Sequence, residues 1–116
     1  MHWVGSSKED LLRFPEAVLD DIGYALGAVQ MGGHPASAKA WKGLGTGVFE
    51  LVEDDRSGTY RAVYTVRFRR AVYVLHAFQK KSPSGIRTAR RDVDLVAMRL
   101  KAATDDYEVR YGKKTD

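Results

Sequence analysis

Positively charged residues gather in one part of the chain, and their side chains are the first candidates for chemistry. Between Arg56 and Arg91 there are ten Lys or Arg residues and not a single Asp or Glu. Such a surface is suited to a polyanion, whereas a face that only keeps a protein in solution usually mixes both signs. A solvated face without a ligand is the competing interpretation. The arginines of this block are candidates for a phosphate site, because one guanidinium can bind two phosphate oxygens.

The same block contains the clearest strand pattern in the sequence, YRAVYTVRF followed by AVYVLHAFQKK. Side chains alternate between the two faces of a strand, so each run divides into a core set and a solvent set. The predicted core sets are Tyr60, Ala62, Tyr64, Val66 and Phe68, then Val72, Val74, His76 and Phe78. The predicted solvent face carries Arg61, Arg67, Tyr73, Gln79 and Lys81, with Glu50 as its one carboxylate. A slip of one residue in either strand would invert this assignment.

Helical and turn signals surround these strands. Leu19, Ile22, Leu26 and Val29 recur at helical spacing after Pro15, which can occupy the first position of a helix. The predicted helices are 8–14, 15–31 and 90–103, and the predicted strands are 48–53, 60–68 and 71–81, with a further edge strand at 2–5. The segment 34–47 is predicted as a loop. This order predicts an α+β fold: a small antiparallel sheet of three to four strands, with two N-terminal helices and one C-terminal helix packed on one face.

Length and composition restrict the possible classes. A chain of 116 residues predicts one domain, 1–116, with 104–116 as a frayed tail in which Tyr107, Val109 and Tyr111 could instead form a short edge strand. The absence of cysteine excludes disulfides, cysteine nucleophiles and thiolate metal sites, and fits a cytoplasmic protein. The three histidines lack ligand spacing, so we expect no metal and no cofactor. No apolar run is long enough to span a membrane, so we expect no membrane partner.

Four segments in a fixed order carry a resemblance: KGLGTGVFELVED, YRAVY, YVLHAFQKKS and RDVDLVAMRL, between Lys42 and Leu100. Together they resemble the RelE/ParE toxin superfamily, and most of all its phage-derived, HigB-like branch. The resemblance implies a RelE-like fold and a toxin of a type II toxin–antitoxin pair. Its partners would be a helix-turn-helix antitoxin, in a hetero-oligomer, together with the ribosome and mRNA.

The superfamily contains two kinds of activity, and a fold alone does not choose between them. Many members cleave mRNA in the ribosomal A site, whereas the ParE branch inhibits DNA gyrase. We therefore expect a metal-independent endoribonuclease, with a non-catalytic, gyrase-blocking toxin as the alternative and an inactive relative as a third interpretation.

By resemblance, Arg61 and the basic pair Lys80 and Lys81 take the positions of functional residues. Cleavage by attack of a ribose 2′-OH on the phosphate needs a base, a charge stabiliser and an acid. Arg61 would stabilise charge, Lys81 would move protons, and Glu50 would be the base or an ion-pair partner of Arg61. The candidate RNA-binding residues are Arg67, Gln79, Lys39, Lys42, Arg56 and Arg87.

Two positions depart from the superfamily pattern. Val52 follows Glu50-Leu51, where many members have arginine, and no tyrosine lies between Ser82 and Arg91, where several ribonuclease members have one. These departures leave the non-catalytic alternatives open. Two aromatic residues also have open interpretations: Trp41 either stacks on a base or packs over the sheet edge, and His76 is either an acid–base group or a satisfied core histidine.

Overall fold

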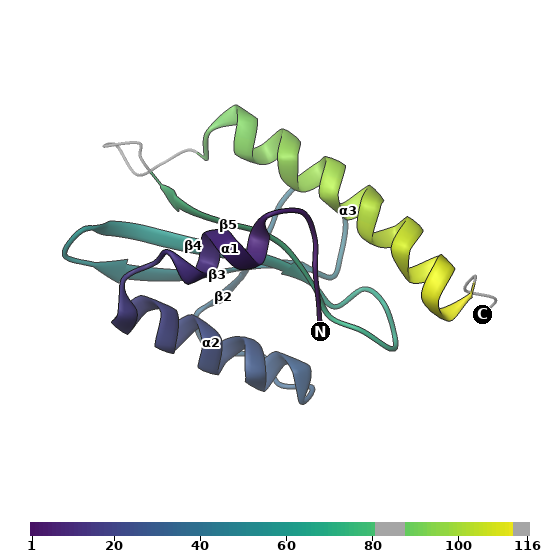
Figure 1. Cartoon of the computed structure of the whole chain (residues 1–116), viewed down its shortest axis with the longest axis horizontal. Coiled ribbons are helices and arrows are strands. Elements are labelled where there is room, and N and C mark those ends of the chain that lie inside the picture. The colour runs from purple at the N-terminus through teal and green to yellow at the C-terminus, as the bar shows by residue number, and fades with distance from the viewer. Residues whose placement is uncertain (81–87, 113–116) are drawn as a thin grey trace.

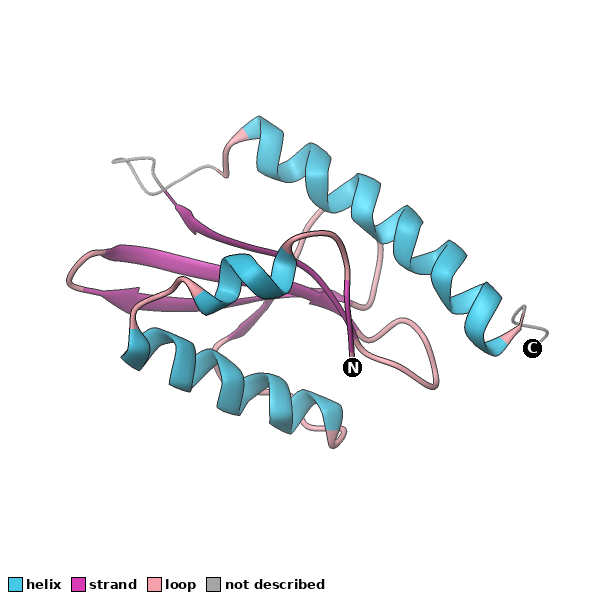
Figure 2. Ribbon diagram, in the orientation of Figure 1, coloured by secondary structure: helices cyan, strands magenta, loops and turns pink. Residues whose placement is uncertain are grey.

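The computed structural model describes residues 1–80 and 88–112 and confirms the α+β class. The elements are β1 His2–Trp3, α1 Ser7–Leu12, α2 Glu16–Gln30, β2 Ala38–Ala40, β3 Val48–Asp55, β4 Gly58–Thr65, β5 Tyr73–Lys80 and α3 Arg90–Tyr111. Figure 1 and Figure 2 show the sheet with helices on both sides. The strand order is β1-β5-β4-β3-β2, which makes a five-stranded sheet.

The sheet is larger and more mixed than the sequence predicts. β3, β4 and β5 form the expected antiparallel meander, but the edge strand β1 runs parallel to β5. β2 lies inside the predicted loop 34–47 and pairs with β3. It escaped prediction because three residues, Ala38–Ala40, carry no usable alternation.

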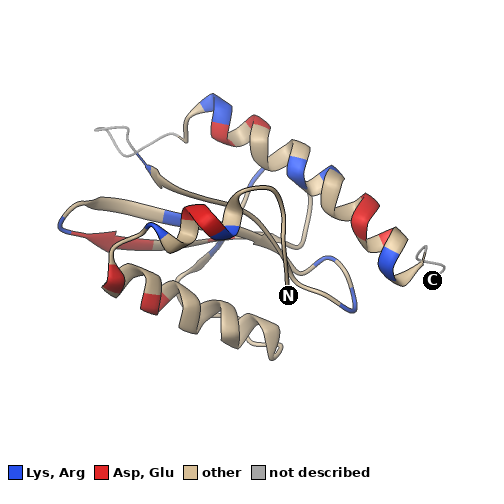
Figure 3. Cartoon of the chain, in the orientation of Figure 1, with Lys and Arg blue, Asp and Glu red and all other residues tan. Residues whose placement is uncertain are grey.

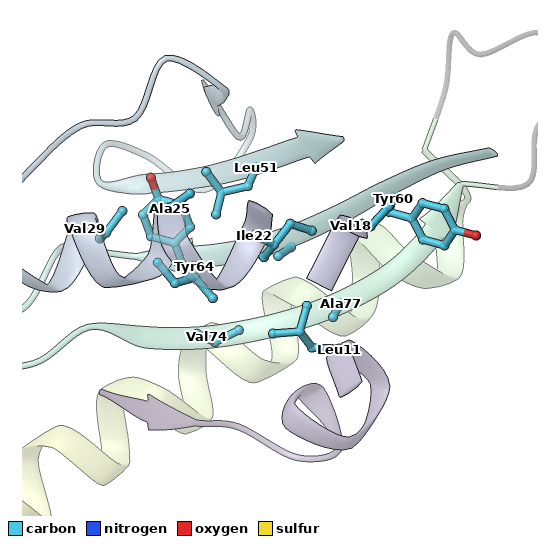
Figure 4. Packing of buried hydrophobic residues seen from close by; sticks show 12 residues of the cluster. Leu11, Val18, Ile22, Ala25, Val29, Leu51, Tyr60, Tyr64, Val74 and Ala77 are labelled. Atoms are coloured by element: carbon cyan, nitrogen blue, oxygen red, sulfur yellow. The ribbon is translucent and has the colours of Figure 1, made fainter. Parts of the chain in front are cut away.

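The helices cover two faces of the sheet instead of one. α1 and α2 bury one apolar cluster against the sheet, in which Ile22 meets Leu51 and Tyr64 (Figure 4). α3 buries a second cluster on the opposite face, where Val96 and Leu100 pack with Val63 and Leu75. The prediction of helices on one face is therefore wrong in layout. Val63 and Leu75 are apolar on the side that was assigned to solvent, and each is fully buried.

α3 continues to Tyr111, beyond the predicted end at Ala103, so residues 104–111 are neither frayed nor a strand. Tyr107 stacks on Phe68 with ring centroids 4.7 Å apart, and Tyr111 meets His2 Nε2 at 2.9 Å. Tyr107 and Tyr111 are four residues apart, which is also the spacing of one helix face. Burial of this face stabilises the last two turns despite their polar composition.

One irregularity in β5 reverses its alternation. Val63 pairs with His76 but Tyr64 pairs with Val74, so Leu75 is an extra residue, a β-bulge. Leu75 and His76 both face α3, and after them Phe78 faces α3 while Ala77 faces α1. His76 and Phe78 are buried as predicted, but on the α3 face of the sheet and not on the face of Val74, because the bulge shifts the alternation.

Arg99 of α3 holds the bulge in place. Its Nη1 donates a hydrogen bond to the carbonyl oxygen of Leu75 at 3.0 Å, and its Nη2 donates to Ser6 Oγ at 3.1 Å. The guanidinium lies against Gly5, whose φ of +56° favours glycine, and an added Cβ there would stand 2.8 Å from Nη2. One side chain thus joins the N-terminal segment, the bulge and α3.

Replacing Arg99 with Met should lower the free energy of unfolding by about 2 kcal/mol, because the Leu75 carbonyl and Ser6 lose a charged donor. Arg90→Met is the matched control on the same helix: Arg90 pairs with Asp94 on an exposed surface, and its loss should cost less than about 1 kcal/mol. Urea denaturation of both variants measures the difference. Equal costs would contradict the role of Arg99.

The Tyr73–Asp106 hydrogen bond predicts a pH dependence at both ends of the scale. Tyr73 O–H donates to Asp106 Oδ2 at 2.6 Å. Burial and then this bond raise the pKa of Tyr73, and the same bond is the first cause of the lowered pKa of Asp106.

The stabilising contribution of Tyr73 is therefore lost as the pH rises above 10, and that of Asp106 is lost as the pH falls below 3.8. Tyr73→Phe should show a shallower decline of stability in both windows, measured by thermal unfolding across pH. Unchanged slopes would refute the coupling.

Candidate functional site

The bulge decides which basic side chains lie beside Arg61. Arg61 projects from β4 toward the α3 side, and Lys80 pairs across the strands with Thr59 on that same side. Gln79 instead pairs with Tyr60, whose ring lies in the α1–α2 cluster. Lys80 therefore shares the face of Arg61, and the prediction that Gln79 does so was wrong, because the alternation on which it rested shifts at Leu75. Lys81 itself lies outside the described residues.

Arg61 is held by an ion pair with Glu50. Its Nη1 donates to Glu50 Oε1 at 2.7 Å, and the two side chains are only 15% and 13% exposed. Nη1 also approaches Thr88 Oγ1 at 3.4 Å, while the buried Nε has no hydrogen-bond partner among the described residues. Of the two roles considered for Glu50, general base or ion-pair partner of Arg61, the structure shows the ion pair. The guanidinium still has a donor that no described residue uses.

Lys80 is the second cation of this cluster. Burial lowers its pKa, the nearby Arg61 guanidinium lowers it further, and Glu50 opposes the change. A lysine with a lowered pKa gives up its proton more readily at neutral pH than an exposed lysine does. The arrangement of Arg61, Glu50 and Lys80 can therefore bind an anion and can exchange a proton with it.

His76 is a satisfied, buried histidine, although it faces α3 and not the side expected for it. Its Nε2 lies 2.8 Å from Asp92 Oδ1, and Arg99 Nη1 approaches its Nδ1 at 3.4 Å. Since a guanidinium only donates hydrogen bonds, Nδ1 is the acceptor and Nε2–H donates to Asp92. Both ring nitrogens are engaged, so His76 supports the strand and has no free nitrogen for substrate.

A groove of about 1100 Å³ runs along the outer edge of β5, between α1 and the start of α3. β1 pairs only with Tyr73 and Val74, so the remaining length of β5 borders this groove. Its described lining combines four cations and three aromatic rings with two carboxylates: Arg13, Lys80, Arg90 and Arg91, then Phe14, Tyr60 and Phe78, then Asp10 and Asp92. Positive charge beside aromatic surface suits a single-stranded nucleic acid, which offers phosphates and bases together.

The other predicted RNA-binding residues are dispersed. Lys39 pairs with Glu50 across the strands and shares the Arg61 face, and Arg56 is exposed in the turn between β3 and β4. Arg67 braces the loop before β3, because its guanidinium donates to the carbonyl oxygens of Leu44 and Thr46. Lys42 is exposed, and Arg87 lies outside the described residues.

The sequence left two interpretations of Trp41 open, and it did not identify several residues that lie close to the site. Trp41 is only 6% exposed and packs in the α3 cluster, which confirms packing over base stacking. Thr88 and Arg13 were missed, because a lone threonine and a lone arginine in polar segments carry no periodic signal. Asp92 had a usable signal, since it lies in the first turn of a helix and can pair with a basic group.

The family comparison matches residues 9–101 to the model described as Phage derived protein Gp49-like (DUF891). A search of curated proteins found no match. Within residues 1–80 and 88–112, no helix has the length and apolar character to cross a membrane. In the same residues no cluster of three or more His, Asp or Glu side chains is arranged to hold a metal ion.

A double-mutant cycle tests the Arg61–Glu50 pair. Arg61→Met and Glu50→Gln should each lower the free energy of unfolding by about 2 to 3 kcal/mol, because each leaves a half-buried polar group without its partner. The double variant should cost less than the sum of the two, by about 1 kcal/mol or more, when measured by denaturant unfolding. Strict additivity would mean that the two charges do not interact.

Proposed function

Because the chain belongs to the phage-derived Gp49-like family, we propose that it is the toxin of a type II toxin–antitoxin pair. We further propose that it acts as a ribosome-dependent endonuclease on mRNA and inhibits translation in the cytoplasm. Its resemblance to the HigB-like branch of the RelE/ParE superfamily supports this assignment. A helix-turn-helix antitoxin would be its partner in a hetero-oligomer, and the whole chain would serve as one toxin domain.

The observation that carries the proposal is the meeting of Arg61 and Lys80 on one face of the sheet. Burial and the Arg61 charge lower the pKa of the lysine, and the Arg61 guanidinium is held in place by Glu50. Phosphoryl chemistry on RNA needs a fixed positive charge and a group that moves protons. The groove along the outer edge of β5, which Lys80 lines, supplies a basic and aromatic path for the RNA strand.

The proposed reaction is an internal transesterification of RNA. The 2′-oxygen attacks the adjacent phosphorus as the 2′-OH gives its proton to neutral Lys80. The P–O5′ bond then breaks, and the 5′-oxygen takes the proton that Lys80 received, directly or through water, leaving a 2′,3′-cyclic phosphate, a 5′-hydroxyl and neutral Lys80. Arg61 offsets the negative charge that grows on the phosphate oxygens. Glu50 holds the guanidinium in place and is a positioning residue in this scheme.

A non-catalytic toxin of the ParE type is the alternative, and one observation favours it. Val52 lies directly opposite Arg61 in the register, where many ribonuclease relatives would place a second cation. With Glu50 already paired to Arg61, the net positive charge at this point is small. Such a protein would block a target such as DNA gyrase by binding alone.

Replacing Lys80 with Ala should lower the rate of mRNA cleavage on translating ribosomes by about 100-fold or more, because the proton-transfer group is lost. Lys101→Ala, an exposed lysine of α3, is the matched control and should retain full cleavage. Circular dichroism and thermal unfolding check that both variants fold. If neither the wild type nor the Lys80→Ala variant cleaves mRNA, and both arrest growth equally, the non-catalytic toxin would be favoured.

A further inference from the structure

The outward face of α2 is unusual for a surface helix. No charged residue occurs from Ile22 to Gly33, although the helix is buried on one side only. Tyr24 is 84% exposed and Met31 is 88% exposed. A helix that faces water on one side normally carries charged residues there, and an uncharged, apolar outer face is typical of a covered one.

These exposed residues lie on one stripe. Glu16, Asp20, Tyr24, Gly27 and Met31 follow one another at spacings of three and four residues. The apolar side chains of Tyr24 and Met31 therefore stand on the same side of α2, with Gly27 between them. A Cβ added at Gly27 would meet nothing within 4 Å, so the backbone here is open to close approach.

The other end of the same stripe is acidic. Glu16, Asp20 and Asp21 are exposed, and within residues 1–80 and 88–112 none of them forms an ion pair. Figure 3 shows acidic residues at the start of α2 and on the neighbouring end of β3, whereas the rest of α2 carries none. Burial, Asp21 and Asp54 raise the pKa of Glu53 on that strand, which reflects the crowding of negative charge there.

We propose that the outward face of α2 is the docking surface for an amphipathic helix of the antitoxin, with apolar residues against Tyr24 and Met31 and Lys or Arg against Glu16 and Asp20. The identity of the partner as an antitoxin rests on the proposed function, whereas the surface and its charge pattern come from the structure. The surface lies on the opposite side of the sheet from Arg61. An antitoxin helix bound there would hold the toxin but would not itself cover the Arg61–Lys80 cluster.

A second copy of the chain fits this face less well. Two α2 helices packed antiparallel would set Glu16 and Asp20 of one copy against the uncharged half of the other. Packed parallel, they would bring like charges together, which is unfavourable. A partner helix with cations at one end satisfies both halves of the stripe.

The experiment is isothermal titration calorimetry of the full chain with the purified antitoxin that the proposed function requires, a helix-turn-helix protein sought in the adjacent gene. Tyr24→Glu combined with Met31→Glu should weaken binding by about tenfold or more, because charge enters an apolar contact. The matched control combines Met98→Glu with Val109→Glu, two exposed apolar residues of α3, and should bind like the wild type. Glu16→Gln with Asp20→Asn should reduce both the affinity and its dependence on salt.

The outcomes separate this inference from the proposed function. Loss of binding in the α3 control but not in the α2 variant, or an equal loss in both, would overturn the docking surface and leave the toxin–antitoxin pair intact. No binding by the wild type would overturn the pairing on which the inference rests. A wild-type dimer in analytical ultracentrifugation that the α2 variant dissociates would assign the face to a second copy instead.

Discussion

One additional residue in β5, Leu75, determines which side chains share a face with Arg61. A strand that alternated strictly would send Gln79 and Lys81 toward Arg61 and turn Lys80 away. The bulge moves Lys80 to the Arg61 face and Gln79 to the other. A bulge leaves a backbone carbonyl outside the ladder, and here the guanidinium of Arg99 satisfies it. The geometry of the candidate site therefore depends on the hydrogen bond that Arg99 of α3 donates to the carbonyl oxygen of Leu75.

The same contact joins parts of the chain that are distant in sequence. Arg99 also reaches Ser6 and lies on Gly5, so the N-terminal segment, β5 and α3 are fixed relative to one another. His76 and Asp92 continue this connection to the first turn of α3, next to the groove. Arg61 and Lys80 thus lie on strands whose neighbours these contacts hold in place, and a fixed position is what a site needs to hold a phosphate in one orientation. The low exposure of Arg61 and Glu50 strengthens their interaction, since less water screens it.

The sequence predicts the meander and the helix that follows Pro15 because both have long, regular apolar periods. It also predicts the ion pair of Arg61 with Glu50 as one of two alternatives, from cross-strand neighbours on one face. It misplaces Lys80 and His76, because a bulge changes the alternation without leaving a glycine or proline at Leu75 to mark it. The second covered face of the sheet was missed for a related reason. Alternation places Val63 and Leu75 on the same face as Arg61, which predicts exposure to solvent, although α3 buries both.

The central claim is that Lys80 stands beside Arg61, half-buried on the same face of the sheet. The most direct test is the pKa of the Lys80 side chain, followed by NMR with the resonance assigned by a Lys80→Arg variant. We expect a pKa below the ordinary 10.5, because burial and the Arg61 charge both disfavour the protonated amine. A pKa at or above 10.5 would contradict it and would mean that β5 does not bring Lys80 to this face.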